Sequence, residues 1–274
     1  MPSLVLPSEI AKARFRSFNL KASGSGAIVR QAKLAEGAGA AAGAGAAALP
    51  VPPALFRAAS NSRPDVENQR KMHALYNDYI DGITKAITNA FDLWRAQAFF
   101  RGIMINGPVA VGGSLEGPSL EPFIVAAAPQ SSLAPASPAI AAGIASAWLS
   151  TQQSVKVPGL PWYPSFAAFP GPVAPPTPNV PMPFITLAQN PMPIMVASLK
   201  ESMAGKLKAK VEFSNELFDS IATWFNAAIQ AWKGMQMVAL VMGMGPVPTF
   251  APPYVPVGPV VGGDNLPTPG HLMT

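Results

Sequence analysis

The histidines and the acidic residues are the side chains of this sequence best suited to acid–base or metal chemistry. His73 and His271 lie far apart in sequence and form no local metal-binding motif, so we expect both to be solvated. Asp78 and Asp81 are three residues apart on an expected helix and could form a carboxylate pair. Lys85 follows Asp81 by four residues, however, and that spacing favours an exposed, salt-bridged helix face.

Motifs for nucleophilic catalysis or phosphate binding are absent from the sequence. Glu116 and Glu121 lie in a Gly/Pro-rich loop without a basic or histidine companion, so we expect them to be solvated. Ser23, Ser25 and Ser114 stand beside glycines, but none lies in a Gly-x-Ser-x-Gly motif. The chain has no cysteine, which excludes disulfides and thiolate sites. We therefore predict no catalytic residue, no cofactor site and no metal site: the chain is not expected to be an enzyme.

The composition indicates a chain that packs against a surface. Apolar residues make up 49% of it and charged residues 12%, and 32 of its 274 residues are proline. Between residues 122 and 199 the only charge is Lys156, and after Lys233 the only charge is Asp264. Disordered chains are polar and highly charged, because they cannot bury enough apolar surface to offset their ordering entropy. This chain has the opposite composition.

Apolar periodicity predicts a mainly α, non-compact fold of long amphipathic helices. Residues 61–108 carry an apolar stripe at steps of three and four, which predicts a long helix that ends at Gly107–Pro108. A shorter, uncharged helix is expected over 138–153, within a segment 109–192. Residues 193–245 are expected to hold a long helix with a heptad-like seam up to Met242, and Gly205 is a candidate point of interruption.

The remaining segments are rich in proline or glycine and are expected to be extended. Residues 1–60 are predicted to form a basic, Gly/Ala-rich arm, and residues 246–274 a C-terminal strap that parallels a strap over 157–193. Proline has no backbone donor, so a regular sheet ladder or helix is not expected in the straps. Their aromatic residues need burial, by neighbouring chains or by the chain's own helices, and we favour neighbours. The predicted packing anchors are Trp94, Trp148, Trp232, Trp162, Phe250 and Tyr254.

Two stretches resemble minor structural proteins of tailed-phage particles. They are SPAIAAGIASAW, Ser137–Trp148, and GPVPTFAPPYVPVGPVV, Gly245–Val261. The resemblance is one of style and contains no specific motif, so it transfers no functional residue. It implies a structural subunit of a virion, in a tail, baseplate, neck or capsid. Its partners would be other structural proteins and copies of itself.

Two alternatives remain open at this point. A membrane-active protein could bind or enter an envelope through amphipathic faces such as the one with Trp224, Phe225 and Trp232. We expect neither a signal peptide nor a transmembrane helix, because proline interrupts the long uncharged stretches. The basic arm, with Arg14 and Arg16, could also contact nucleic acid, but docking on an acidic protein surface is favoured.

Overall fold

The structure, a computed structural model, describes the backbone of residues 4, 6–18, 20 and 62–272. Contacts divide the chain into two units. The smaller unit, Arg16–Asp78, contains the first half of a long helix, and there Gln69 donates a hydrogen bond of 3.0 Å to the carbonyl of Leu20. The larger unit comprises the described residues up to Phe15 together with those from Tyr79 onward. It holds the core and every site discussed below.

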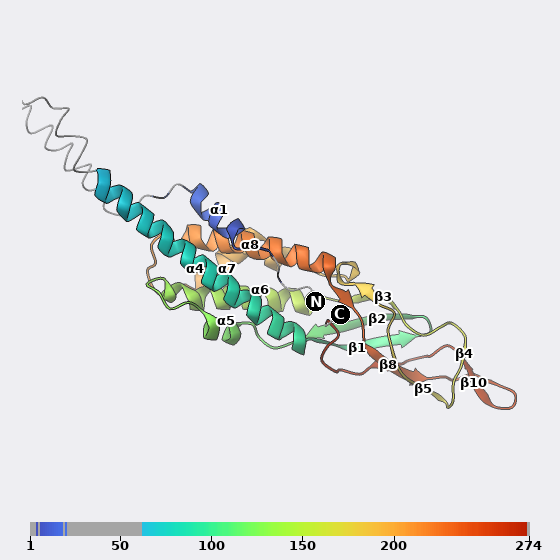
Figure 1. The fold of residues 1–274 in the computed structure, drawn as a ribbon. Coiled ribbons are helices and arrows are strands. Elements are labelled where there is room, and N and C mark those ends of the chain that lie inside the picture. The colour runs from blue at the N-terminus through green and yellow to red at the C-terminus, as the bar shows by residue number, and fades with distance from the viewer. Residues whose placement is uncertain (1–3, 5, 19, 21–61, 273–274) are drawn as a thin grey trace, which may run out of the picture. The chain divides into compact units, whose positions relative to one another are not determined.

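The helices of the larger unit lie side by side, and the strands extend from one end of them (Figure 1). The second half of α4 packs beside α6 and α8, and α7 contacts both α6 and α8. Three 3₁₀ turns connect the longer elements. The helices are α1 (Glu9–Ser17), α4 (Ser62–Gln97), α5 (Glu121–Ala127), α6 (Ser137–Ser154), α7 (Val196–Lys206) and α8 (Ser214–Met235), with the turns η1 (Ala134–Ala136), η2 (Phe184–Thr186) and η3 (Met192–Ile194).

Short antiparallel sheets make up the rest of the larger unit (Figure 1). Three of them have three strands, in the orders β1-β2-β3, β4-β10-β9 and β11-β8-β5, and β6 pairs with β7. The strands are β1 (Phe99–Asn106), β2 (Val109–Glu116), β3 (Val157–Pro161), β4 (Ala167–Ala168), β5 (Val173–Pro178), β6 (Met182–Pro183), β7 (Met237–Val238), β8 (Met242–Pro246), β9 (Phe250–Ala251), β10 (Val255–Gly258) and β11 (Asp264–Asn265).

The prediction of a mainly α, non-compact fold is wrong. Of the described residues, about 49% are helical and 22% lie in strands, and they surround a packed core, so the fold combines α and β structure. The helix predicted up to residue 108 ends at Gln97, and β1 follows it. Within β1, Ile103 and Ile105 alternate onto one buried face, and Phe100 nearer the start of the strand is buried as well. Gly107, with φ of 68°, forms the turn into β2 and does not terminate a helix.

The heptad-like segment also divides. Helices α7 and α8 are separate, with a break after Lys206, so the interruption expected at Gly205 is present one residue later. Helix α8 ends at Met235, and Met242, the last member of the predicted seam, begins strand β8. The uncharged helix predicted over 138–153 is confirmed as α6. Most of its residues are buried, as an uncharged helix requires.

The proline-rich straps form sheets with the chain's own strands, contrary to the expectation that proline would prevent a ladder. In the pairing of β5 with β8, Ala174 lies opposite Gly245 and Thr177 opposite Gly243. The register shifts between Ala174 and Thr177, where Pro175 and Pro176 stand. Strand β5 therefore keeps its pairing by placing the residues that lack a donor at an irregularity.

Amide side chains supply some of the hydrogen bonds that the prolines cannot make. Asn265 accepts from the N–H of Ile103 at 2.9 Å and donates to the carbonyl of Phe100 at 2.6 Å. Asn179 accepts from the N–H of Val241 at 3.0 Å and donates to the carbonyl of Val238 at 3.0 Å. Both amides are buried and bridge segments that are distant in sequence. Buried backbone groups thus find partners without a continuous ladder.

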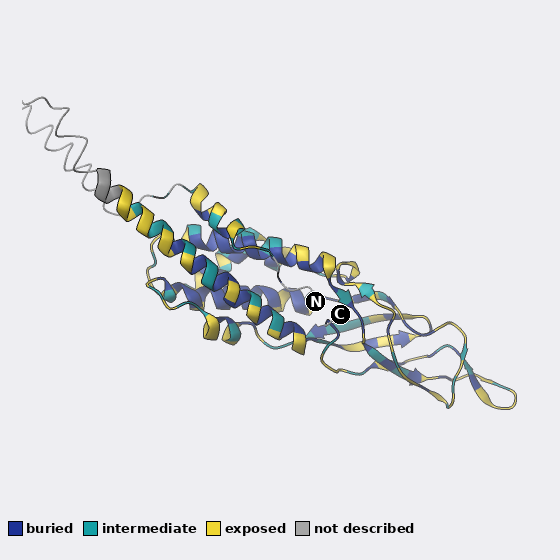
Figure 2. Ribbon diagram, viewed as in Figure 1, coloured by how far each residue is buried: buried dark blue, intermediate teal, exposed yellow. Residues whose placement is uncertain are grey.

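The core of the larger unit is an aromatic cluster between α4, α6 and α8. Phe91 lies 5.1 Å from Trp94, 5.1 Å from Trp148 and 4.9 Å from Trp232, between ring centroids. Phe184 of η2 closes the cluster at 4.9 Å from Trp232. Most of these rings meet edge to face, the arrangement that aromatic pairs prefer. Figure 2 shows the buried faces of these helices turned toward one another.

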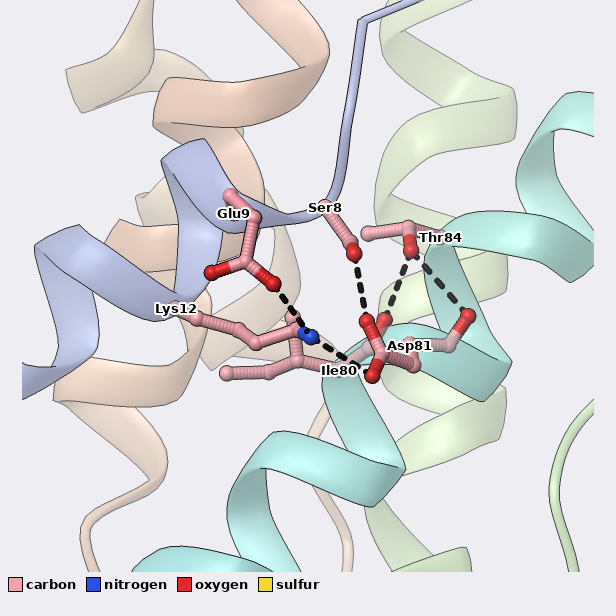
Figure 3. Close-up of polar contacts among 6 residues, drawn as sticks. All are labelled: Ser8, Glu9, Lys12, Ile80, Asp81 and Thr84. Atoms are coloured by element: carbon pink, nitrogen blue, oxygen red, sulfur yellow. Dashed lines mark hydrogen bonds and ion pairs between the residues drawn. The ribbon is translucent and has the colours of Figure 1, made fainter.

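The N-terminal helix α1 is held by ion pairs on α4 (Figure 3). The Lys12 ammonium lies 2.7 Å from the Asp81 carboxylate and 2.8 Å from Glu9, and Ser8 donates a hydrogen bond to Asp81. The hydrogen bond to Asp81 is the main reason that the pKa of Lys12 is raised. Residues 9–17 are helical and not extended, and two of their basic residues, Lys12 and Arg14, pair with carboxylates of the same chain. The rest of the predicted arm, residues 21–61, lies outside the described residues.

Candidate functional site

The predicted packing anchors separate into buried and exposed residues. Trp94, Trp148 and Trp232 belong to the aromatic cluster, so the structure brings these three together. Two further anchors are in the C-terminal strap and are exposed: Phe250 keeps 53% of its surface and Tyr254 keeps 88%. The exposed pair has no core role within the described chain and is available to a partner.

The anchor Trp162 joins a strap to the chain's own sheets. Its indole N–H donates to the carbonyl of Thr177 at 2.8 Å. The hydroxyl of the neighbouring Tyr163 donates to the carbonyl of Gly243 on β8 at 2.5 Å, and burial raises the pKa of this tyrosine. Both side chains are buried. The first strap therefore buries these aromatic residues without a neighbouring chain.

Exposed aromatic residues of the straps lie in or beside the sheet β4-β10-β9. We define the strap surface as Phe166, Phe250, Tyr254 and Val255: Phe166 immediately precedes β4, Phe250 is in β9, Tyr254 is in the turn and Val255 begins β10. Phe166 is the second most exposed of them, at 75%. No charged residue occurs between Lys156 and Lys200 or between Lys233 and Asp264. The strap surface is therefore apolar and formally uncharged.

The turn that carries Tyr254 is held by hydrogen bonds. The N–H of Tyr254 donates to the carbonyl of Ala251 at 2.7 Å, and the N–H of Val257 donates to Thr249 at 2.9 Å. The Thr249 hydroxyl donates back to the carbonyl of Val257. Tyr254 adopts a φ of 84°, a strained conformation for a residue with a side chain. Such strain clusters at binding sites, where the surrounding structure maintains it.

The histidine expected to be solvated in the C-terminal tail is buried. His271 is 1% exposed, and its Nδ1 accepts a hydrogen bond of 2.9 Å from the N–H of Phe100. Its ring stacks on that of Phe100 with centroids 6.2 Å apart. Burial lowers the pKa of His271 to about 4, so the imidazole is neutral at physiological pH. This histidine is a structural acceptor.

Two of the acidic residues considered in the sequence form ion pairs. Asp81 binds Lys12 and Ser8 and so belongs to the α1 attachment. Glu116 lies at the end of β2, where its carboxylate is 3.8 Å from the Arg101 guanidinium, so it is paired and not simply solvated. Within the described ranges, no three His, Cys, Asp or Glu residues are arranged to hold a metal ion. Across the same residues, no helix is long and apolar enough to cross a membrane.

Sequence reasoning missed a cavity beside the end of β2. It has a volume of about 700 Å³ and is lined mainly by β2, the C-terminal part of α6 and the end of α4. Glutamines form much of its polar wall, and glutamine in a helix carries no distinctive sequence signal. Only the packing of three segments distant in sequence brings these amides together.

Comparison with known proteins gives no relative. No family model, curated protein or solved structure matches this chain. Its function is therefore inferred from its own geometry.

Replacing Lys233 with methionine should stabilise the protein at neutral pH. Lys233 is buried, the described residues provide it with no ion pair or hydrogen bond, and burial lowers its pKa to about 8 from 10.5. Because the unfolded chain binds this proton more tightly, the native state loses stability at pH values below 8 and recovers it as pH rises toward 10.5. We expect Lys233→Met to raise the free energy of unfolding by about 2 kcal/mol at pH 7 and by less than about 1 kcal/mol at pH 10.

Urea unfolding of both proteins at the two pH values measures this. Lys206→Met, at an exposed lysine of α7, is the matched control and should change stability by less than about 0.5 kcal/mol. A gain for Lys233→Met that is equal at pH 7 and pH 10 would contradict the prediction, because it would come from packing alone.

Proposed function

We propose that this chain is a structural subunit of a larger protein assembly, without catalytic chemistry of its own, and that it docks through the strap surface. The observation that carries the proposal is the exposure of Phe166, Phe250 and Tyr254 on one small uncharged sheet. Each such ring carries about 150–250 Å² of mainly apolar surface. Burying them on a neighbour stabilises an assembly, since apolar burial contributes about 25 cal/mol/Å².

An uncharged protein surface fits the strap surface better than a charged partner does. The core of a protein–protein interface is depleted in charged residues and enriched in aromatic ones. The turn of Tyr254 is also held in place before any partner binds, so docking costs little ordering entropy. We propose further copies of this chain as the first partner, because closed homo-oligomers are the commonest soluble assemblies.

The particle that we propose is a tailed-phage virion, in a tail, baseplate, neck or capsid. The support is the resemblance of Ser137–Trp148 and Gly245–Val261 to minor structural proteins of such particles. The second of these stretches contains three residues of the strap surface, Phe250, Tyr254 and Val255. In a virion, other structural proteins would cover what copies of the chain leave exposed.

The solution mass of the purified protein tests the proposal. We expect size-exclusion chromatography with light scattering to give a mass that rises with concentration above the 28.5 kDa of one chain. Serine at Phe166, Phe250 and Tyr254 together should weaken self-association at least about tenfold, because about 1.4 kcal/mol of lost burial has that effect. The matched control places serine at Leu93, Val125 and Ile185, which are exposed apolar residues elsewhere, and should associate like the unmodified chain.

Two results would contradict the proposal. A monomer at every concentration would show that the chain does not self-associate. Equal association of the two triple variants would show that the strap surface takes no part in self-association. Flotation with neutral liposomes distinguishes the membrane-active alternative, which the same exposed aromatic residues would serve. Binding to liposomes that the strap-surface variant loses, without self-association, would replace the assembly proposal with that alternative.

A further inference from the structure

The cavity beside β2 contains a polar group that the fold itself does not use. Gln152, in α6, is 4% exposed and lines this cavity. Its Oε1 accepts a hydrogen bond of 2.9 Å from the indole N–H of Trp94. An indole N–H can only donate, so the atom that faces Trp94 must be the oxygen. The orientation of this buried amide is therefore fixed by chemistry.

The same bond determines where the other end of the amide lies. With its oxygen on Trp94, Gln152 holds its NH₂ group away from the aromatic cluster. Among the described residues, this NH₂ group has no hydrogen-bond partner, although the side chain is almost completely buried. A buried amide that leaves two donors unused loses free energy unless water or a ligand accepts from them. The donors are available at the wall of the cavity.

The rest of the wall offers complementary groups. Gln97 donates to the carbonyl of Leu93 at 3.3 Å, which leaves its side-chain oxygen as an acceptor. The Glu116 carboxylate accepts, and the Ser114 hydroxyl can donate or accept. Apolar side chains, including Phe99 and Leu149, also line the cavity. The wall therefore combines donors, acceptors and apolar surface over a volume typical of ligand sites.

We propose that this cavity binds a neutral saccharide. A sugar hydroxyl donates and accepts at once, so a ring of hydroxyls can satisfy the Gln152 NH₂ group and the Glu116 carboxylate together, while its C–H faces pack on Phe99. A single carboxylate, paired with Arg101, disfavours an anionic ligand and is too little charge to select a cation. The site is separate from the strap surface and does not depend on the proposed assembly.

An extended peptide fits this wall less well. Peptides usually bind in extended form by adding a strand to an exposed sheet edge, which requires main-chain donors. Two of the lining residues, Pro118 and Pro269, have no N–H. The polar groups that the cavity does provide belong to side chains, an arrangement suited to hydroxyl groups in several directions.

An array of immobilised neutral and anionic glycans, probed with the full chain, tests the proposal. We expect retention on neutral glycans, and calorimetry with the best neutral oligosaccharide should then give one site per chain. Gln152→Glu is the informative variant: it keeps an oxygen for the Trp94 indole and replaces only the NH₂ donors. It should weaken affinity at least about tenfold. Gln130→Glu adds the same charge at an exposed site outside the cavity and should bind like the unmodified chain.

A second variant keeps the test decisive if Gln152→Glu unfolds. Ser114→Ala removes one hydroxyl from the wall and should lower the affinity about three- to tenfold. Absence of binding to every neutral glycan would overturn the proposal, as would equal affinities of Gln152→Glu and Gln130→Glu. The peptide PTFAPPYVPVG, which is residues 248–258 of the C-terminal strap, serves as the competing ligand. If the cavity binds this peptide and no glycan, the cavity belongs to a peptide partner and the proposal is overturned.

Discussion

Replacing Trp232 with alanine will lower the free energy of unfolding by about 4 kcal/mol, since it removes the ring that three elements share. In the native structure its centroid lies 4.9 Å from Phe91, 6.0 Å from Trp148 and 4.9 Å from Phe184. These rings come from α4, α6 and η2, so the alanine leaves a cavity that no single helix movement can close. Urea unfolding at pH 7, followed by circular dichroism at 222 nm, measures the loss.

The matched control is Phe250→Ala, at a residue that the sequence also marked as an anchor. Phe250 keeps about half of its surface exposed, so the isolated chain should lose less than about 0.5 kcal/mol. Trp232→Phe should cost less than the alanine, because it keeps a ring and removes an indole N–H that has no hydrogen-bond partner among the described residues. Losses of similar size for Trp232→Ala and Phe250→Ala would show that the cluster is not the core of the isolated chain.

The protein will lose about 3 kcal/mol of stability between pH 6.5 and pH 4 through His271 alone. Its pKa is about 4 in the native state and 6.5 in a solvated histidine. Between these two values the unfolded chain binds the proton and the native chain does not, so stability falls as pH falls. Below pH 4 both states are protonated and the loss is complete. Burial beside Phe100 is the physical cause.

The comparison with His271→Gln isolates this contribution. Glutamine can still accept from the N–H of Phe100 but does not titrate, whereas every carboxylate titrates in both proteins. We expect the variant to be less stable at pH 7, and the two free energies of unfolding to converge as pH approaches 4. Parallel curves across this window would mean that the pKa of His271 is not lowered in the native state and would contradict its burial.

Local periodicity was sufficient for the helices and insufficient for the strands. The stripe of α4 places Ile80, Ile83, Ile87 and Trp94 in the core, as predicted, because each is fixed by its neighbours three and four residues away. The same rule extended the helix through β1, where a run of apolar residues suits either structure. The expectation that proline prevents a ladder in the straps is wrong, because β5 pairs with β8, which begins more than 60 residues later.

For the candidate sites too, the sequence indicated the residue types but not which of those residues the fold would bury. Which of the predicted anchors would be buried could not be known, because Trp162 and Phe250 occur in similar proline-rich surroundings and differ only in what packs against them. The burial of His271 depends on Phe100, and the orientation of the Gln152 amide depends on Trp94. Neither pair is close in sequence.

The sequence by itself determined the position of α6, the helical character of residues 214–235 but not where α8 ends, the scarcity of charge in the straps and the apolar identity of the anchors. Only the tertiary structure decided that the straps fold back as sheets, that Phe166, Phe250 and Tyr254 remain exposed together, and that a cavity opens beside Gln152. The physical reason is the sequence separation of the residues that interact. Helix formation is set by contacts three and four residues apart, whereas burial and sheet pairing are set by segments that meet only after the chain has folded.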